Sequence, residues 1–134
     1  MKITLIVGLP GCGKSTYAKN HLTESSLVYD LDAIASAFRL CQPHDEYHKG
    51  SRQLANMFLD DFVNYALDYT DNLLIIRTAP PVEDLDFISP SELVWCRERY
   101  AFRPIPHEER VLERINTAVR WCNDNSIPVI YYPY

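Results

Sequence analysis

Residues 3–16 read ITLIVGLPGCGKST, and they combine an apolar run, a glycine-rich turn and the beginning of a helix. The apolar run from Ile3 to Val7 is typical of a buried β-strand. Residues 8–15 match the phosphate-binding pattern G-x-x-x-x-G-K-[ST] at every fixed position. The alternative is a glycine-rich turn that binds nothing, but the strand before it and the helix after it favour phosphate binding.

The spacing suits a polyphosphate, which needs many hydrogen-bond donors at close range. Glycines at 8, 11 and 13 let successive backbone N–H groups point into one concavity. A helix that begins near residue 13 adds unpaired N–H groups and the positive end of its dipole. We expect Lys14 to reach the β- and γ-phosphates, Ser15 to bind Mg²⁺ and Thr16 to contact an α-phosphate. The expected cofactors are ATP and Mg²⁺, and the expected nucleotide-binding residues are Gly8, Pro10, Gly11, Cys12, Gly13, Lys14, Ser15 and Thr16.

The composition limits the classes of protein to consider. A chain of 134 residues with 47% hydrophobic and 23% charged residues is typical of one globular domain, here residues 1–134. No apolar run approaches the ~20 residues that span a membrane, so we expect no membrane partner. The chain runs from Met1 straight into the first strand, which predicts no signal peptide and a cytoplasmic location.

Charge and cysteine content add two expectations. The net charge of −5 does not favour nucleic acid, so such a ligand would need a local basic patch. The four cysteines are far apart in sequence and include no C-x-x-C pair. In an intracellular protein we expect these thiols to stay reduced.

Strand-like and helix-like segments alternate along the chain. Strands are predicted at 2–7, 27–30, 73–76, 92–96 and 127–131, and helices at 13–22, 32–40, 50–69, 82–87 and from 106 to about 122. This alternation predicts an α/β fold, a three-layer α/β/α sandwich around a mainly parallel five-stranded sheet. In the longest helix we expect the buried face to carry Leu54, Phe58, Phe62, Tyr65 and Tyr69, which recur at spacings of three and four.

Ligands of parallel sheets bind at the carboxyl ends of the strands, where polar residues follow each predicted strand. Asp30 and Asp32 follow the second strand. Beside a triphosphate, one carboxylate can hold the metal through water while the other accepts the proton of an attacking hydroxyl. The competing interpretation is that Asp32 caps the helix that begins there.

Arginines occupy the remaining strand ends. Arg39 lies about two helical turns after Asp32 and contacts the acceptor or is solvated near a helix end. Arg77 follows the third strand; it binds an anion or, if buried, needs a partner such as Asp30 or Asp32. The basic stretch after the fourth strand is either a lid over the transferring phosphoryl group or a solvated loop paired with glutamates, and it holds Arg97, Arg99 and Arg103. Arg110 and Arg114 read as ordinary surface residues.

These residues resemble the small P-loop kinases. The phosphate loop, the D-x-D of residues 30–32 and the arginines after the fourth strand look like those of polynucleotide kinase, zeta-toxin-like kinases and shikimate kinase. The whole chain looks most like the short AAA-type ATP-binding or kinase-like proteins of bacteria and their phages. The resemblance implies a P-loop NTPase fold, Asp32 as general base, Asp30 near the metal and a short arginine lid. The chain departs from the pattern at Arg77, where many P-loop proteins carry an acid.

Two functions follow from these expectations. The first is an ATP-dependent phosphotransferase that moves the γ-phosphoryl group to a hydroxyl acceptor, a nucleotide or a polynucleotide 5′-hydroxyl. The alternative is a nucleotide-binding or slow NTPase module that acts with a protein partner and has no kinase activity. The expected catalytic residues are Lys14, Asp32, Arg97, Arg99 and Arg103, and the expected acceptor-binding residues are Asp30, Asp32, Arg39 and Arg77.

Overall fold

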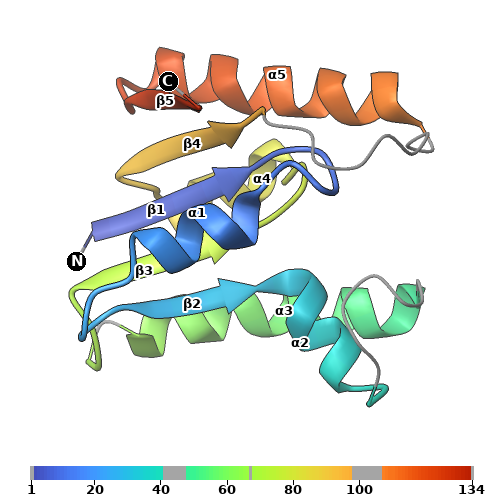
Figure 1. The fold of residues 1–134 in the computed structure, drawn as a ribbon, viewed down its shortest axis with the longest axis vertical. Coiled ribbons are helices and arrows are strands. Elements are labelled where there is room, and N and C mark those ends of the chain that lie inside the picture. The colour runs from blue at the N-terminus through green and yellow to red at the C-terminus, as the bar shows by residue number, and fades with distance from the viewer. Residues whose placement is uncertain (1, 41–47, 67, 98–106, 134) are drawn as a thin grey trace.

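The computed structural model describes residues 2–40, 48–66, 68–97 and 107–133, and their centre is one parallel sheet. Its strands lie in the order β2-β3-β1-β4-β5, and every pair of neighbours is parallel (Figure 1). Because the strands run the same way, their carboxyl ends share one edge of the sheet. The strand bounds are β1 (Lys2–Val7), β2 (Leu27–Asp30), β3 (Asn72–Ile76), β4 (Glu92–Cys96) and β5 (Val129–Tyr132).

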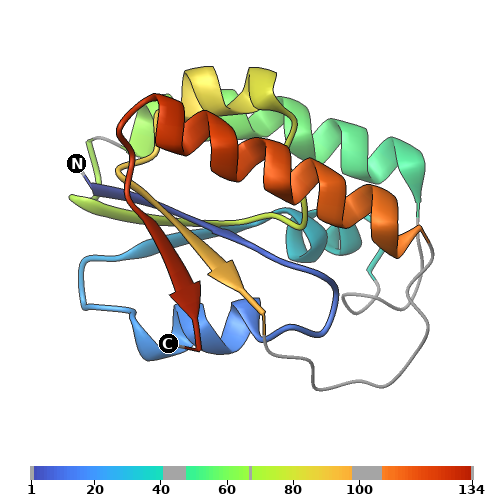
Figure 2. The ribbon, with the colours of Figure 1, turned by 90° about the horizontal axis from the view of Figure 1, so that it is seen from above.

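Helices cover both faces of the sheet, but unequally. Helix α1 lies on one face, and α3, α4 and α5 cover the opposite face (Figure 2). The three-layer α/β/α sandwich predicted from the sequence is therefore confirmed. The helix bounds are α1 (Lys14–Asn20), α2 (Leu31–Ala37), α3 (Lys49–Ala66), α4 (Val82–Ile88) and α5 (Glu108–Asp124).

The central strand β1 is apolar on both sides because helices pack on both of its faces. Leu5 and Val7 point into the larger core, which includes residues of α3, α4 and α5. Ile6 points the other way, against Tyr17 and Ala18 of α1. Side chains alternate along a strand, so one apolar run feeds two separate cores. This burial fixes the end of β1, from which the phosphate loop leaves the sheet.

The predicted buried face of α3 is wrong. Leu54, Phe58, Tyr65 and Tyr69 are all exposed, with Tyr65 at 68% and Tyr69 at 79%, and only Phe62 is packed against the core. The buried face instead carries Ser51, Ala55, Leu59, Val63 and Ala66. The small side chains let the helix approach closely, and the hydroxyl of Tyr29 of β2 donates a hydrogen bond to the Ala55 carbonyl. Residues on two faces of this helix recur at spacings of three and four, and the size of their side chains does not identify the buried face.

Element ends differ from the predictions by a few residues. Helix α1 ends at Asn20 rather than at residue 22, and α2 spans 31–37 rather than 32–40. Strand β5 begins at Val129, after Pro128, whose nitrogen has no proton for the sheet ladder. Within the described parts of the chain, none of the helices has the length and apolar character needed to cross a bilayer.

Candidate active site

The phosphate loop joins the end of β1 to the beginning of α1, at the carboxyl edge of the sheet. Three glycines in it have positive φ angles: Gly8 at 154°, Gly11 at 78° and Gly13 at 95°. At Gly8 a side chain is also excluded by space, because a Cβ would lie 2.3 Å from the Cys12 sulfur and 2.5 Å from the Cys96 carbonyl oxygen. The fixed glycine at the first position of the motif therefore has a local steric reason.

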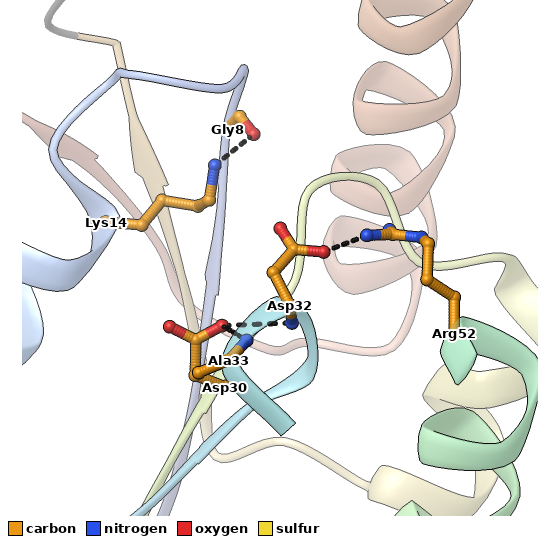
Figure 3. A network of polar contacts seen from close by, with 6 residues as sticks. All are labelled: Gly8, Lys14, Asp30, Asp32, Ala33 and Arg52. Carbon is orange, nitrogen blue, oxygen red and sulfur yellow. Dashed lines mark hydrogen bonds and ion pairs between the residues drawn. The ribbon is translucent and has the colours of Figure 1, made fainter. Parts of the chain in front are cut away.

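Lys14 is buried, with 9% of its surface exposed, and its side chain folds back onto the loop. Its Nζ donates a hydrogen bond to the carbonyl oxygen of Gly8, at 2.8 Å (Figure 3). It also donates one to the carbonyl oxygen of Leu9, at 3.0 Å. Ser15 and Thr16 follow in the first turn of α1 and are exposed. The loop thus presents a cation, two hydroxyls and the N-terminal amides of α1 at one place.

Asp30 caps α2. Its Oδ1 accepts hydrogen bonds from the backbone N–H groups of Asp32, at 3.1 Å, and Ala33, at 3.3 Å (Figure 3). The capping interpretation therefore applies to Asp30, and its assignment to Asp32 is wrong. Burial raises the pKa of the Asp30 carboxyl, and the nearby Asp32 charge adds to this effect, against the opposing influence of the capping amides and Lys14.

Asp32 forms an ion pair with Arg52, which reaches across from the first turns of α3 (Figure 3). The side chains are partly exposed, 22% for Asp32 and 33% for Arg52. Since the Asp32 side chain does not cap α2, its carboxylate is available to a ligand at the strand ends. Its pairing keeps a positive charge beside it, and a bound anion can compete for that charge.

The residues present fit a Mg²⁺ ion that is held mainly by phosphate and water. Mg²⁺ takes oxygen ligands, commonly one or two from the protein together with substrate phosphates. Ser15 offers a hydroxyl, and the partly buried Asp30 offers a carboxylate whose raised pKa reflects poor solvation. Among the described residues, no three His, Cys, Asp or Glu side chains gather as a cage. Ser15 and Asp30 therefore remain the candidate metal ligands.

A large cavity of about 1250 Å³ opens beside the loop, between α2, α3 and the beginning of α5. Asp32 and Arg39 both line it, although α2 ends at Ala37 and Arg39 lies beyond the helix, and Pro10 of the loop borders it. Asp32 is the only carboxylate among its described lining residues. Its cations come from four parts of the chain and comprise Arg39, Lys49, Arg52, Arg77, Arg110 and Arg114. A protein of net charge −5 thus builds one strongly basic cavity.

Arg77 lines this cavity but is paired outside the D-x-D segment. Its guanidinium donates to the Asp84 carboxylate of α4, and the two side chains are only 9% and 12% exposed. The prediction that Asp30 or Asp32 pairs with Arg77 is wrong, because Asp30 caps α2 and Asp32 pairs with Arg52. The buried pair holds the cation at the end of β3, and what it binds beyond Asp84 stays a prediction.

Of the three predicted lid arginines, Arg97 lies among the described residues. Arg97 lies outside the wall of the large cavity, with its guanidinium carbon 4.6 Å from the centre of the Tyr131 ring. Arg99 and Arg103 lie outside the described residues.

Sequence reasoning missed four cations of the cavity. No motif in the sequence points to Lys49 or Arg52, and the pattern around Arg110 and Arg114 predicts ordinary surface residues. Lys49 and Arg52 are three residues apart and Arg110 and Arg114 are four apart, so each pair shares a helix face. That spacing is equally common on solvated helices, so only the cavity that these residues line in the folded chain identifies them.

Comparison with known proteins places the chain among P-loop proteins. A family model described as RNA helicase matches residues 4–82, more than half of the chain. A chain of the Pnkp1/Rnl/Hen1 RNA repair complex is similar in structure, with a TM-score of 0.54 and 15% identity over 92% of this chain, which spans 38% of the length of that chain. A sugar kinase from Janibacter is similar with a TM-score of 0.52 and 16% identity, covering 92% of this chain and 95% of that one. No curated protein matches in sequence. At these identities the solved structures show a shared fold.

Proposed function

The chain belongs to the RNA helicase family, and we propose that it binds ATP with Mg²⁺ and transfers the γ-phosphoryl group to a hydroxyl of a phosphate-bearing acceptor. The acceptor is a nucleotide or the 5′-hydroxyl end of a polynucleotide. The observation that carries the proposal is the cavity beside the phosphate loop, where the described lining residues include six cations and one carboxylate, Asp32. A neutral acceptor such as a free sugar carries no negative charge for these cations to bind.

On the nucleotide side, the loop amides and the beginning of α1 cradle the phosphates. The Lys14 ammonium leaves the Gly8 and Leu9 carbonyls and pairs with the β- and γ-phosphates, where its charge opposes the charge of the transferring group. Ser15 and Asp30 hold the Mg²⁺, which supplies further neutralisation of the phosphate oxygens when it is bound. Gly8, Pro10, Gly11, Cys12, Gly13 and Thr16 complete the nucleotide contact.

On the acceptor side, the ion pair between Asp32 and Arg52 is the starting point. An acceptor phosphate attracts the Arg52 guanidinium, which favours planar, bidentate contact with phosphate. Asp32 then accepts the proton of the attacking hydroxyl. A bond forms between that oxygen and the γ-phosphorus, the bond to the bridging oxygen breaks, and ADP leaves with the bond electrons. Arg39, Arg77, Arg110 and Arg114 hold the remaining acceptor charge.

The structural relatives support this proposal at the level of the fold, since a chain of an RNA repair complex and a sugar kinase share the architecture. The choice of a phosphate-bearing acceptor rests on the basic cavity of this chain. The cavity also supplies the local basic patch that the net charge of −5 requires of any nucleic-acid ligand.

The test uses γ-labelled ATP with a matched series of acceptors: a nucleoside, nucleoside monophosphates, 5′-hydroxyl oligonucleotides of RNA and DNA, and a neutral sugar. We expect label only in phosphate-bearing acceptors. Asp32→Asn is expected to abolish transfer while ATP affinity stays unchanged, because Asp32 touches the acceptor and not the loop. Equal labelling of the sugar, or loss of ATP binding in Asp32→Asn, would contradict the assignment.

A second candidate is an NTPase module that hydrolyses ATP in response to RNA or a protein partner. Two observations favour it. The family model is described as RNA helicase, and the residue after β3 is Arg77, paired with Asp84, where an acid facing the metal is expected. In this case the basic cavity binds the RNA backbone and water replaces the acceptor hydroxyl. Phosphate release that RNA stimulates, with no label in any oligonucleotide, would favour this function over transfer.

A further inference from the structure

A second, smaller pocket of about 210 Å³ borders the phosphate loop, and two thiols line it. Cys12 is the residue between the second and third glycines of the loop, and Cys96 is the last residue of β4. Both are free cysteines, and the Cys96 thiol hydrogen-bonds to the Cys12 sulfur. The pocket therefore lies against two hydrogen-bonded thiols, whose residues are 3% and 1% exposed.

The surroundings of Cys12 favour its thiolate. The hydrogen bond from Cys96 is the largest influence, and together with the charge and amide of Lys14 it lowers the pKa of Cys12 to about 7, against the effect of burial. The Lys14 Nζ lies 3.8 Å from the Cys12 sulfur. Cys122 gives a contrast within the same chain: it is also buried and free, and burial alone raises its pKa to about 11. Thiolates are the reactive form, so the two buried cysteines differ in reactivity.

We propose that Cys12 and Cys96 form a modification site that reacts with hydroperoxides and closes to a disulfide, and that nucleotide bound in the phosphate loop protects it. The site is defined by the pocket, the contact between the two sulfurs and the neighbouring Lys14 ammonium. The thiol chemistry stands independently of the proposed function, whereas the protection rests on nucleotide binding by the loop.

The reaction has two balanced steps. The Cys12 thiolate attacks one oxygen of the hydroperoxide, a sulfur–oxygen bond forms, the oxygen–oxygen bond breaks, and the second oxygen leaves as hydroxide or alkoxide. Cys12 is oxidised to a sulfenic acid. The Cys96 sulfur then attacks the Cys12 sulfur, a disulfide bond forms, and the hydroxyl group leaves with the Cys96 proton as water. One equivalent of hydroperoxide is reduced for each disulfide.

Nucleotide and oxidation are coupled through Lys14. Phosphates draw its ammonium away from the Cys12 sulfur and place negative charge over the loop, and both changes disfavour the thiolate. The slower oxidation is a kinetic effect, whereas the equilibrium effect comes from the disulfide, which restrains the loop at residue 12 and weakens nucleotide binding; by linkage, nucleotide then disfavours the disulfide by the same factor. We expect the disulfide form to bind ATP roughly 5- to 150-fold more weakly, the usual range of coupling between sites.

The experiment treats the reduced full chain carrying Cys41→Ser with hydrogen peroxide, with and without ATP and Mg²⁺, and maps thiols by peptide mass spectrometry. Cys122 is the matched internal control. We expect a peptide linked through Cys12 and Cys96, reversal by dithiothreitol, a reduced Cys122 and slower oxidation with ATP. In Cys96→Ser the reaction is expected to stop at a sulfenic acid on Cys12 that dimedone traps. The unsubstituted chain is mapped in parallel, so the result does not depend on either variant folding.

The two parts of the proposal fail separately. Reduced Cys12 and Cys96 at a peroxide dose that oxidises the denatured chain, or oxidation of Cys122 at the same rate, would overturn the site. Calorimetry on the reduced protein measures ATP binding independently. If ATP binds and oxidation is not slowed, the coupling is wrong while the nucleotide site stands. If ATP does not bind, the proposed function and the coupling fail together, and the disulfide map still decides the thiol site.

Discussion

The ion pair between Asp32 and Arg52 offers the sharpest test of the acceptor site. Truncation of Arg52 to alanine removes the cation that we assign to an acceptor phosphate and leaves the phosphate loop untouched. In the free protein the pair is 22% and 33% exposed, so its loss is expected to lower the free energy of unfolding by about 1 kcal/mol or less. The variant should therefore fold.

The effect on transfer is expected to be much larger than the effect on stability. A hydrogen bond to a charged group contributes about 1.5–3 kcal/mol, which corresponds to a loss of roughly 10- to 150-fold in kcat/KM for the acceptor. ATP affinity should stay unchanged, because the Arg52 guanidinium pairs with Asp32 of α2 and lines the acceptor cavity. Arg52→Lys keeps the charge but not the planar fork, so an intermediate loss is expected.

The assay is steady-state transfer from γ-labelled ATP to a 5′-hydroxyl oligonucleotide, with ATP affinity measured separately by calorimetry. Arg120→Ala is the matched control, because Arg120 is an exposed arginine of α5 that lies outside the cavity wall and contacts Thr117. The reasoning is refuted if Arg52→Ala leaves kcat/KM for the acceptor within the range of the control. It is also refuted if ATP affinity falls in parallel with transfer.

Three further predictions concern the elements that hold the site. Gly8→Ala must place a Cβ 2.3 Å from the Cys12 sulfur at a φ of 154°, so we expect a loss of roughly 1–3 kcal/mol in urea denaturation, together with loss of ATP binding. Burial raises the pKa of Asp30, so the folded state binds its proton more tightly and stability falls as pH rises from the unfolded value, about 3.9, through the higher folded value. Asp30→Asn should keep the cap and lose this pH dependence of stability, whereas Asp30→Ala should lower the free energy of unfolding by about 1 kcal/mol because the cap is lost. Urea melts between pH 3 and 8 separate the two variants, and equal melts would show that the cap contributes nothing. Asp84→Ala leaves Arg77 buried without its carboxylate, so a loss of about 3–5 kcal/mol is expected in thermal or chemical melts, with a smaller loss when Arg77→Met is combined with Asp84→Leu.

The fold was predictable because its signals are local and repeated. The bounds of β1, β2 and β4 are the predicted ones, since each is a short apolar run bounded by turn residues or by a helix. The α3 helix was predicted, but its buried face was not. Its period fits both the aromatic face and the face of Ser51, Ala55 and Leu59, and only the sheet that it packs on selects between them.

The candidate site was predictable in its nucleotide half and only partly in its acceptor half. The phosphate loop is one continuous segment, so its chemistry can be inferred from spacing alone. The cavity wall brings together residues from α2, α3, the end of β3 and α5, and no spacing in the sequence records that association. The capping role of Asp30, rather than Asp32, depends on a one-residue difference in where α2 begins, and helix ends are the least predictable feature of a sequence.

The two halves of the site also differ in how the family model covers them. Residues 4–82 include the phosphate loop, Asp32 and Arg52, but not Arg110 and Arg114, which α5 contributes to the cavity. In the two functions proposed above, hydrolysis and transfer would use the same loop to activate the same phosphoryl group and would differ in which oxygen lies beside Asp32. The cavity wall would determine which oxygen this is, because cations that hold an acceptor place its hydroxyl beside Asp32 and exclude water. In both proposed functions the α5 arginines contact a phosphate-bearing ligand, so their effect on the products separates the two. Arg110→Ala combined with Arg114→Ala should divert the γ-phosphoryl group from the acceptor to water in a phosphotransferase, and should lower RNA-stimulated hydrolysis in an NTPase.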